Sequence, residues 1–132
     1  MEETRVIDDL ELETSQEQIV LKTMILFPAV IDECAMVLNR ANFFNKAFGS
    51  LFQILVLRHQ SGLPIDVIAL VEISKQVFSG RQVAQMAEFL TDSKFELPHH
   101  AHIRYYCEKV LEGSKLRDLK CLVDRVKVDW SP

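Results

Sequence analysis

The sequence contains few residues that break helices. Glycine and proline each occur 4 times among 132 residues, which leaves little material for the many tight turns of an all-β fold. Hydrophobic residues make up 48% of the chain and charged residues 26%, an ordinary composition for a globular protein. The length suits one domain, with a core large enough to fold without metals or disulfide bonds. The composition therefore favours a single helical domain.

Cysteine is scarce as well. The 3 cysteines, Cys34, Cys107 and Cys121, are widely spaced and fall mostly on apolar helical stripes. We interpret them as buried free thiols of a protein in a reducing compartment. No basic-then-apolar leader opens the chain, and its longest stretch without a charged residue, 47–57, is far shorter than the roughly 20 residues that span a bilayer. We therefore expect a cytoplasmic protein without membrane contact.

The chain lacks an excess of positive charge. Its formal net charge is −4 and its pI is near 5.5, so the field of the whole domain does not attract phosphate backbones. One helical stretch near the C-terminus is rich in basic residues, but acidic residues are interleaved with them, as on an exposed helix face with i,i+4 pairs. Direct nucleic-acid binding is therefore not expected. The basic residues are Lys109, Lys115, Arg117, Lys120, Arg125 and Lys127, and the acidic ones are Glu108, Glu112, Asp118 and Asp124.

Motifs for catalysis or cofactor binding are also missing. No G-x-x-x-x-G-K-[ST] pattern occurs, so the chain carries no nucleotide-binding P-loop. His99, His100 and His102 lie near Cys107, and the i,i+3 spacing of His99 and His102 could place two imidazoles on one metal ion. However, the sequence has no C-x-x-C or H-x-x-x-H pair, and a Pro-His-His turn at a helix start is commonly a solvated cap. We predict no catalytic residues, cofactor or metal, with a metal-dependent enzyme built around the histidines as the alternative.

The chain divides into three predicted parts. Residues 1–14 carry 6 acidic residues and a single basic one without a helical stripe, which predicts a flexible acidic arm. Residues 15–97 show apolar residues at helical spacing and predict a helical core. Residues 98–132 predict a longer C-terminal helix with an oligomer contact. The predicted fold class is all-α, a compact bundle of about five short helices plus this longer helix.

Local signals place the boundaries of the core helices. Ser15 and Gln18 have the S-x-x-Q spacing of a capping box and predict the start of the first helix. Pro28 suits the first turn of the second helix. Asn45 and Asp66 are predicted N-caps of the third and fourth helices.

The C-terminal helix shows two apolar stripes on different faces. Gly113 lies at the change between them, where glycine costs about 1 kcal/mol relative to alanine. Either the helix breaks there and folds its tail back onto the domain, or it continues and offers the second stripe to another subunit. The first stripe is Ile103, Tyr106, Cys107 and Val110, and the second is Leu116, Leu119, Val123 and Val126. The candidate interface residues are Tyr105, Leu116, Leu119, Val123 and Val126.

A set of residues between Ser15 and Leu119 has the order and spacing of a known family. The set comprises Glu17, Gln18 and Leu21, then Pro28, then Phe43-Phe44 with Phe52 eight residues later, then Gly62-x-Pro64-Ile65-Asp66, and finally Ile103-x-Tyr105-Tyr106. With these residues the chain resembles the amino-terminal domain of the bacterial replicative DNA helicase of the DnaB type. We expect the aromatic pair to fill the gap between helices.

The resemblance implies a small all-helical domain without catalytic activity. In that family the domain joins a ring-forming collar and docks the carboxy-terminal domain of primase, which couples unwinding to primer synthesis. The implied function is a non-catalytic assembly and protein-interaction domain of a replicative helicase, whose full-length relative is an ATP-dependent DNA helicase. The alternative is a stand-alone helical adaptor or regulator of helicase or primase with the same fold.

The sequence departs from the family pattern at three places. Lys46 and Phe48 occupy a stretch where the family usually has proline and histidine, and Ser79-Gly80-Arg81 replaces a Gly-Gly turn. The family's last helix turns back into a second helix to form a dimerising hairpin, whereas this chain ends at Pro132. We expect that difference to affect the hairpin contact.

Overall fold

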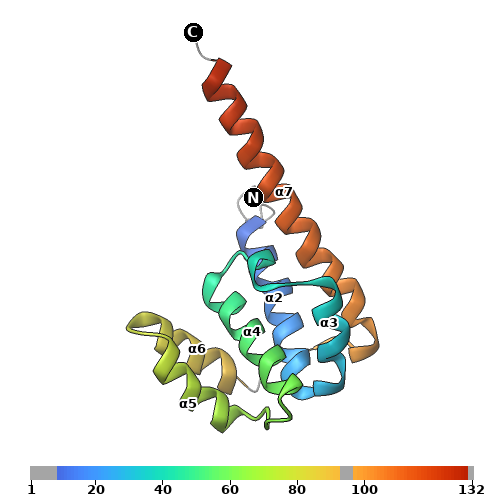
Figure 1. Ribbon diagram of the computed structural model, residues 1–132, viewed down its shortest axis with the longest axis vertical. Helices are drawn as coiled ribbons and strands as arrows, with labels where there is room; N and C mark the ends of the chain where they lie inside the picture. Colours follow the sequence, from blue (N-terminus) through green and yellow to red (C-terminus); the bar gives the residue numbers. More distant parts are fainter. Residues whose placement is uncertain (1–8, 93–96, 131–132) are drawn as a thin grey trace, which may run out of the picture.

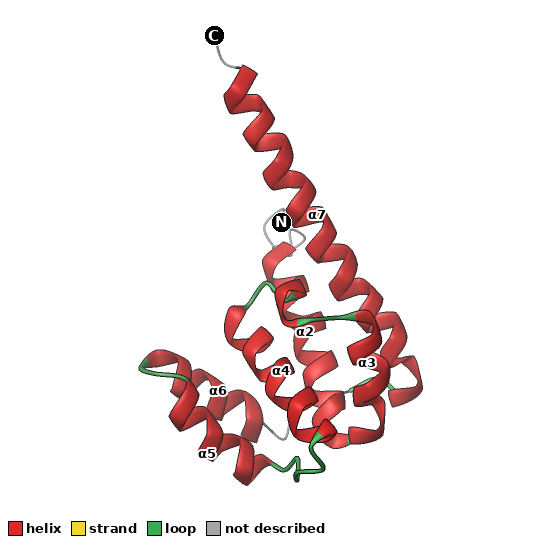
Figure 2. Cartoon of the chain, in the orientation of Figure 1, coloured by secondary structure: helices red, strands yellow, loops and turns green. Residues whose placement is uncertain are grey.

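The computed structural model describes residues 9–92 and 97–130. This part of the chain is built from helices joined by short loops (Figure 2). The prediction of an all-α fold with a longer C-terminal helix is confirmed. The elements in order are α2 (Asp9–Leu26), the 3₁₀-helix η1 (Pro28–Val30), α3 (Ile31–Val37), the 3₁₀-helix η2 (Arg40–Asn42), α4 (Lys46–Gln60), α5 (Val67–Val77), α6 (Arg81–Thr91), the 3₁₀-helix η3 (His100–His102) and α7 (Ile103–Trp130).

The hydrophobic core forms around α2. This helix packs against α4 on one side and against the first half of α7 on the other (Figure 1). Its residues Val20, Leu21 and Met24 are completely buried, and each such side chain contributes about 1.5–3 kcal/mol when it leaves water. The apolar residues predicted for one face of α4 complete this core. They are Phe48, Leu51, Phe52 and Leu55, all buried.

A close backbone contact fixes how α4 meets η2. A Cβ atom at Gly49 would lie 2.6 Å from the carbonyl oxygen of Arg40. Only glycine leaves room for this approach. The contact holds the loop after α3 tightly against the first turn of α4.

The predicted helix boundaries of the middle of the chain are confirmed. The side chain of Asn45 accepts hydrogen bonds from the backbone N–H groups of Ala47 and Phe48, and so caps α4. Asp66 caps α5 by accepting from the N–H of Ala69 at 2.8 Å. Gly62, which follows α4, has a φ of 72°, a conformation that glycine adopts without strain.

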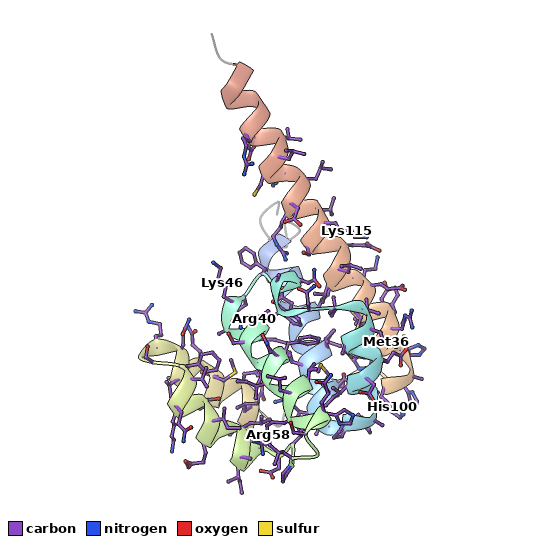
Figure 3. All side chains as sticks on the ribbon, viewed as in Figure 1. Met36, Arg40, Lys46, Arg58, His100 and Lys115 are labelled. Atoms are coloured by element: carbon purple, nitrogen blue, oxygen red, sulfur yellow. The ribbon has the colours of Figure 1, made fainter. Side chains whose placement is uncertain are left out.

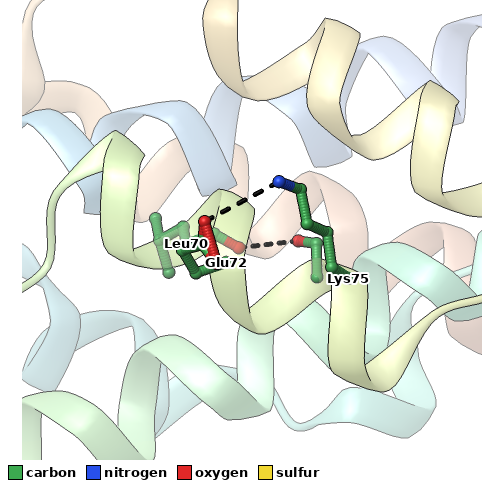
Figure 4. Close-up of polar contacts among 4 residues, drawn as sticks. Leu70, Glu72 and Lys75 are labelled. Carbon is green, nitrogen blue, oxygen red and sulfur yellow. Dashed lines mark hydrogen bonds and ion pairs between the residues drawn. The ribbon is translucent and has the colours of Figure 1, made fainter.

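Helices α5 and α6 form a hairpin that packs beside the core, at the lower left of Figure 1. The buried hydroxyl of Ser74 donates to the carbonyl oxygen of Leu70 at 2.8 Å, which satisfies a polar group inside the hairpin. On the exposed side of the same helix, Lys75 Nζ lies 3.7 Å from Glu72 Oε1 (Figure 4). The hairpin therefore has a buried face and a charged outer face.

The first helix begins earlier than the sequence pattern predicts. Helix α2 begins at Asp9, so residues 9–14, predicted as part of a flexible arm, are helical. Ser15 and Gln18 lie inside this helix, and the predicted capping box is wrong. Negative charge is favourable near the N-terminal end of a helix, so the acidic composition of this segment is compatible with a helix. Residues 1–8 of the predicted arm lie outside the described residues.

Two further expectations need correction. Phe43 is buried as predicted, but the adjacent Phe44 is 41% exposed and does not fill a gap in the core. Cys34 and Cys107 are buried between α3 and α7, whereas Cys121 is exposed because α7 has left the body at that point. A hydrogen bond with Cys107, together with burial, raises the pKa of the Cys34 thiol above its usual range.

Candidate protein-interaction site

The two halves of α7 have different surroundings. In the first half Ile103, Cys107 and Val110 are buried against the body. The helix continues without a break past Gly113 and projects beyond the other helices in Figure 1. The alternative in which the helix breaks at Gly113 and folds back is therefore wrong. The second apolar stripe lies on a helix that has left its own core.

A small set of polar contacts marks the point where α7 leaves the body. Arg117 Nη2 donates to the carbonyl oxygen of Asn42 at 2.9 Å, and its guanidinium lies 5.3 Å from the ring centroid of Phe44. The Asn42 side chain donates to the hydroxyl of Ser114 at 3.3 Å. These contacts, which we call the α7 tether, connect η2 and the loop after it to the middle of α7.

Four apolar side chains at and beyond the tether are exposed. The exposed fractions are 65% for Leu116, 56% for Leu119, 54% for Leu122 and 44% for Val123. At about 100° per residue these positions fall within roughly 120° of the helix circumference, so they form one continuous surface, which we call the distal stripe. Lys115, labelled in Figure 3, lies beside it on the same helix.

The structure brings together most of the predicted interface residues. Leu116, Leu119 and Val123 share the distal stripe. Val126 lies on α7, but its side chain is outside the described residues. Tyr105 is 55% exposed, yet it precedes Leu116 by 11 residues, about 16 Å along the helix axis. Tyr105 therefore does not join the stripe.

Sequence reasoning missed Leu122. Its signal was available, because Leu122 lies three residues after Leu119 and six after Leu116 and so borders the same face. The predicted second stripe, Leu116, Leu119, Val123 and Val126, covers only a narrow part of the helix surface. A wider apolar face of the kind found on amphipathic helices would have included this residue.

The residues of the histidine stretch make local contacts at the start of α7. His99 Nδ1 accepts a hydrogen bond from the N–H of Ala101 at 3.1 Å and so caps η3. His100 stacks on Phe27, with ring centroids 4.5 Å apart. Among the described residues, no group of three or more histidine, cysteine, aspartate or glutamate side chains could hold a metal ion.

Several basic residues of α7 have partners on the domain itself. Arg104 lies 3.8 Å from Glu108, and Lys109 lies 3.7 Å from Glu112. Arg117 belongs to the α7 tether. The segment of α7 from Arg104 to Arg117 therefore presents charges of both signs, and its described side chains form no continuous basic surface. Within the described ranges, no helix is long and apolar enough to cross a membrane.

The fold and the distal stripe together define an all-helical domain that presents an apolar surface on a projecting helix. The family model for the DnaB-like helicase N terminal domain matches residues 10–112. The chain therefore belongs to this family, as the sequence motifs predicted.

A solved structure has the same fold. The N-terminal domain of the DnaB helicase from Helicobacter pylori, described together with its interactions with primase, superposes with a TM-score of 0.73 at 22% sequence identity. The superposition covers 93% of this chain and 98% of that one. No curated protein sequence matches this chain.

Proposed function

We propose that this chain is a non-catalytic assembly and protein-interaction domain of a cytoplasmic replicative DNA helicase, in which the distal stripe joins two copies. The observation that carries the proposal is the exposure of Leu116, Leu119, Leu122 and Val123 on the part of α7 at and beyond its tether to the body. Apolar side chains grouped in this way are typical of protein contacts. In this proposal residues 15–97 form the helical core, to which the first half of α7 adds Ile103, Cys107 and Val110, and the contact between copies lies within residues 98–132.

A straight helix with one apolar face can pair with a second copy of itself about a two-fold axis. In such a pair the same surface is used twice, and each copy covers the leucines of the other. Charged residues of both signs, such as Lys115, Asp118 and Lys120, lie along the same segment. In an antiparallel pair they can meet residues of opposite charge at the rim. We expect Val126 to extend this contact by one turn.

The test replaces Leu119→Glu and Val123→Glu together. Self-association should be lost because two carboxylates would be buried in an apolar contact. Light scattering should then give a dimer or larger species for the parent chain and a monomer for the variant, with unchanged helical circular dichroism. The control is Cys121→Glu, which adds one carboxylate at an exposed position on the opposite side of α7 and is compared with each of the two single variants, Leu119→Glu and Val123→Glu.

Two outcomes would contradict this proposal. One is a parent chain that stays monomeric at all concentrations reached. The other is a double variant that unfolds, which would mean that the stripe belongs to the domain's own core.

We further propose that the domain docks the carboxy-terminal domain of primase. Membership of the DnaB N-terminal family supports this partner, and so does the shared fold of the H. pylori domain described with its interactions with primase. Calorimetric titration with the primase domain of the same organism should give saturable binding. Absence of heat and of co-migration in size-exclusion chromatography, with a folded domain, would argue against primase as the partner.

A further inference from the structure

Two cysteines meet where α3 packs against the first half of α7 (Figure 1). The side chains of Cys34 and Cys107 are completely buried, and their thiols share a hydrogen bond. Each cysteine lies in the middle of the buried apolar face of its helix. The flanking buried residues are Ile31 and Leu38 on α3 and Ile103 and Val110 on α7.

An ion pair on the surface joins the same two helices at the same level. Arg104 Nη1 lies 3.9 Å from Glu33 Oε2. Glu33 immediately precedes Cys34, and Arg104 lies about one helical turn before Cys107. The ion pair and the contact of the thiols therefore indicate one register of α3 against α7, in which the two sulfur atoms face each other.

In the packed structure neither thiol is open to reaction. A cysteine reacts as the thiolate, and the hydrogen bond with Cys107 together with burial raises the pKa of the Cys34 thiol. Both side chains have an exposed fraction of 0%, so an oxidant in solution cannot reach them. Oxidation of this pair therefore requires α3 and α7 to separate.

Helix α3 is the element that can open. It has 7 residues, and its N-cap residue Val30 makes no side-chain capping bond. A helix of this length is not stable in water without packing. Its ion pairs with neighbouring helices, Glu33 with Arg104 and Asp32 with His59 at 3.5 Å, lie at the surface and contribute little. Local opening of α3 should therefore occur well below the free energy of global unfolding.

We propose that Cys34 and Cys107 form a reversible disulfide bond that fixes α3 to the first half of α7. The oxidant is a small disulfide such as oxidised glutathione. In the opened state one cysteine gives its proton to solvent and attacks a sulfur of the oxidant, whose S–S bond breaks and releases a first thiolate. The second cysteine thiolate attacks the protein sulfur of this mixed disulfide and releases the second. The protein loses two electrons and two protons, and the oxidant becomes two thiols.

The bond would make the base of α7 sensitive to oxidation. A covalent link between α3 and α7 prevents the opening that the noncovalent contact permits, and so it holds the half of α7 that carries the projecting segment. Under reducing conditions both cysteines remain thiols, and a thiol reductant returns the oxidised chain to that state. This proposal does not depend on self-association through the distal stripe.

The test uses the full chain with Cys121→Ser, which removes the exposed thiol and with it disulfides between copies. Incubation with oxidised glutathione should produce a chain that has lost two hydrogen atoms by mass spectrometry, with Cys34 and Cys107 joined in the peptide map. The reaction should become faster in urea below the unfolding transition. In the oxidised chain the amides of α3 should exchange roughly tenfold or more slowly, and dithiothreitol should restore the original mass and exchange rates.

The matched control carries Cys34→Ala in addition to Cys121→Ser, and it should show neither the loss of hydrogen nor the slower exchange. Three results with the folded Cys121→Ser chain would overturn the proposal. They are glutathione adducts without an intramolecular bond, a bond that forms only above the unfolding transition, and a bond that leaves the exchange of α3 unchanged or lowers the melting temperature.

Discussion

Glu17 places a carboxylate inside the core, where hydrogen bonds must replace water. Its side chain is 1% exposed, and its oxygens accept from the backbone N–H groups of Phe44 at 2.6 Å and Asn45 at 3.3 Å. These bonds connect α2 to the loop in which Asn45 caps α4. One buried side chain therefore fixes the loop, 27 and 28 residues further along the chain, that leads into α4.

Replacing Glu17→Gln should destabilise the domain by about 1–3 kcal/mol. Glutamine keeps the shape, but its NH2 group cannot accept a bond from either N–H, and a buried donor then loses its partner. The measurement is urea unfolding followed by circular dichroism. The control Glu112→Gln affects only an exposed pair with Lys109 and should change stability by less than about 0.5 kcal/mol. Equal stability of the Glu17 variant and the parent would contradict the assigned role.

Lys22 is the second buried charge that the core holds. Burial lowers its pKa from the usual 10.5, and the nearby carboxylate of Asp92 offsets part of this effect. The ammonium donates to the carbonyl oxygens of Phe89 and Leu90, in the last turn of α6. A cation is favourable at this position because the end of a helix carries partial negative charge.

The lowered pKa of Lys22 predicts a pH-dependent stability. Between the folded pKa and 10.5 the unfolded chain holds more protons, so the free energy of unfolding should rise with pH, by at most about 1.4 kcal/mol per pH unit. The measurement compares urea unfolding of the parent and of Lys22→Met from pH 7 to 10.5. The unfolding free energy of the parent should increase with pH relative to that of Lys22→Met. The exposed-site control Lys75→Met should show the same dependence on pH as the parent. Parallel curves for Lys22→Met would contradict a lowered pKa.

At the residue level, the sequence correctly predicted the side-chain roles that depend on residues nearby in the chain. Asn45 and Asp66 were predicted as caps because each bonds to N–H groups two or three residues away. Glu17 and Lys22 were not predicted as buried charges, since their partners are 27 to 68 residues distant. A carboxylate or ammonium on a helix is usually exposed, and only the fold shows that these two are not.

At the level of elements, the first half of α7 packs against the body, whereas its second half projects beyond the other helices. Residues 118–130 make about four turns beyond the tether, and a helix segment of this length is only marginally stable in water without packing. Its stability should therefore depend on whether a second copy covers the distal stripe.

Hydrogen exchange can test this dependence directly. In dilute solution the amides of residues 118–130 should exchange much faster than those of residues 103–114, because the side chains of residues 118–125 are exposed whereas the first half of the helix is packed against the body. At concentrations where copies associate, protection of residues 118–130 should rise by roughly tenfold or more. The Leu119→Glu and Val123→Glu variant should show no such rise. Strong protection at all concentrations would mean that the segment is held by something other than a second copy.

The sequence located the helices better than it located the surfaces they offer. Apolar spacing predicted the buried face of α4 correctly, since Phe48, Leu51 and Leu55 repeat at helical intervals. The same spacing marked the distal stripe but could not decide between a bend and a projecting helix. That choice depends on the tether of Arg117 to Asn42, a contact over 75 residues that no local pattern encodes.

At the level of the whole molecule, the fold followed from the family motifs because most of their residues lie at a cap, at a turn or in the core. Gly62 and Asp66 end one helix and begin the next, and Pro28 starts another. A groove between the first turn of α4 and α6 had no such signal. Its lining glutamines, Gln18, Gln82 and Gln85, are ordinary surface residues in the sequence and come together only when α2, α4 and α6 are assembled.

The packed half of α7 sets the direction in which its other half projects. The last 13 or so residues extend about 20 Å past Arg117. Their direction is set by the packing of the first half of the helix against α2 and α3, together with the contacts of Arg117 and Ser114 with Asn42 and Phe44. A tilt of about 10° at Arg117 moves the C-terminal end of α7 by roughly 3 Å, nearly the width of a methyl group. A small displacement around Asn42 would therefore produce a larger change in the distance between the C-terminal ends of α7 in two associated copies.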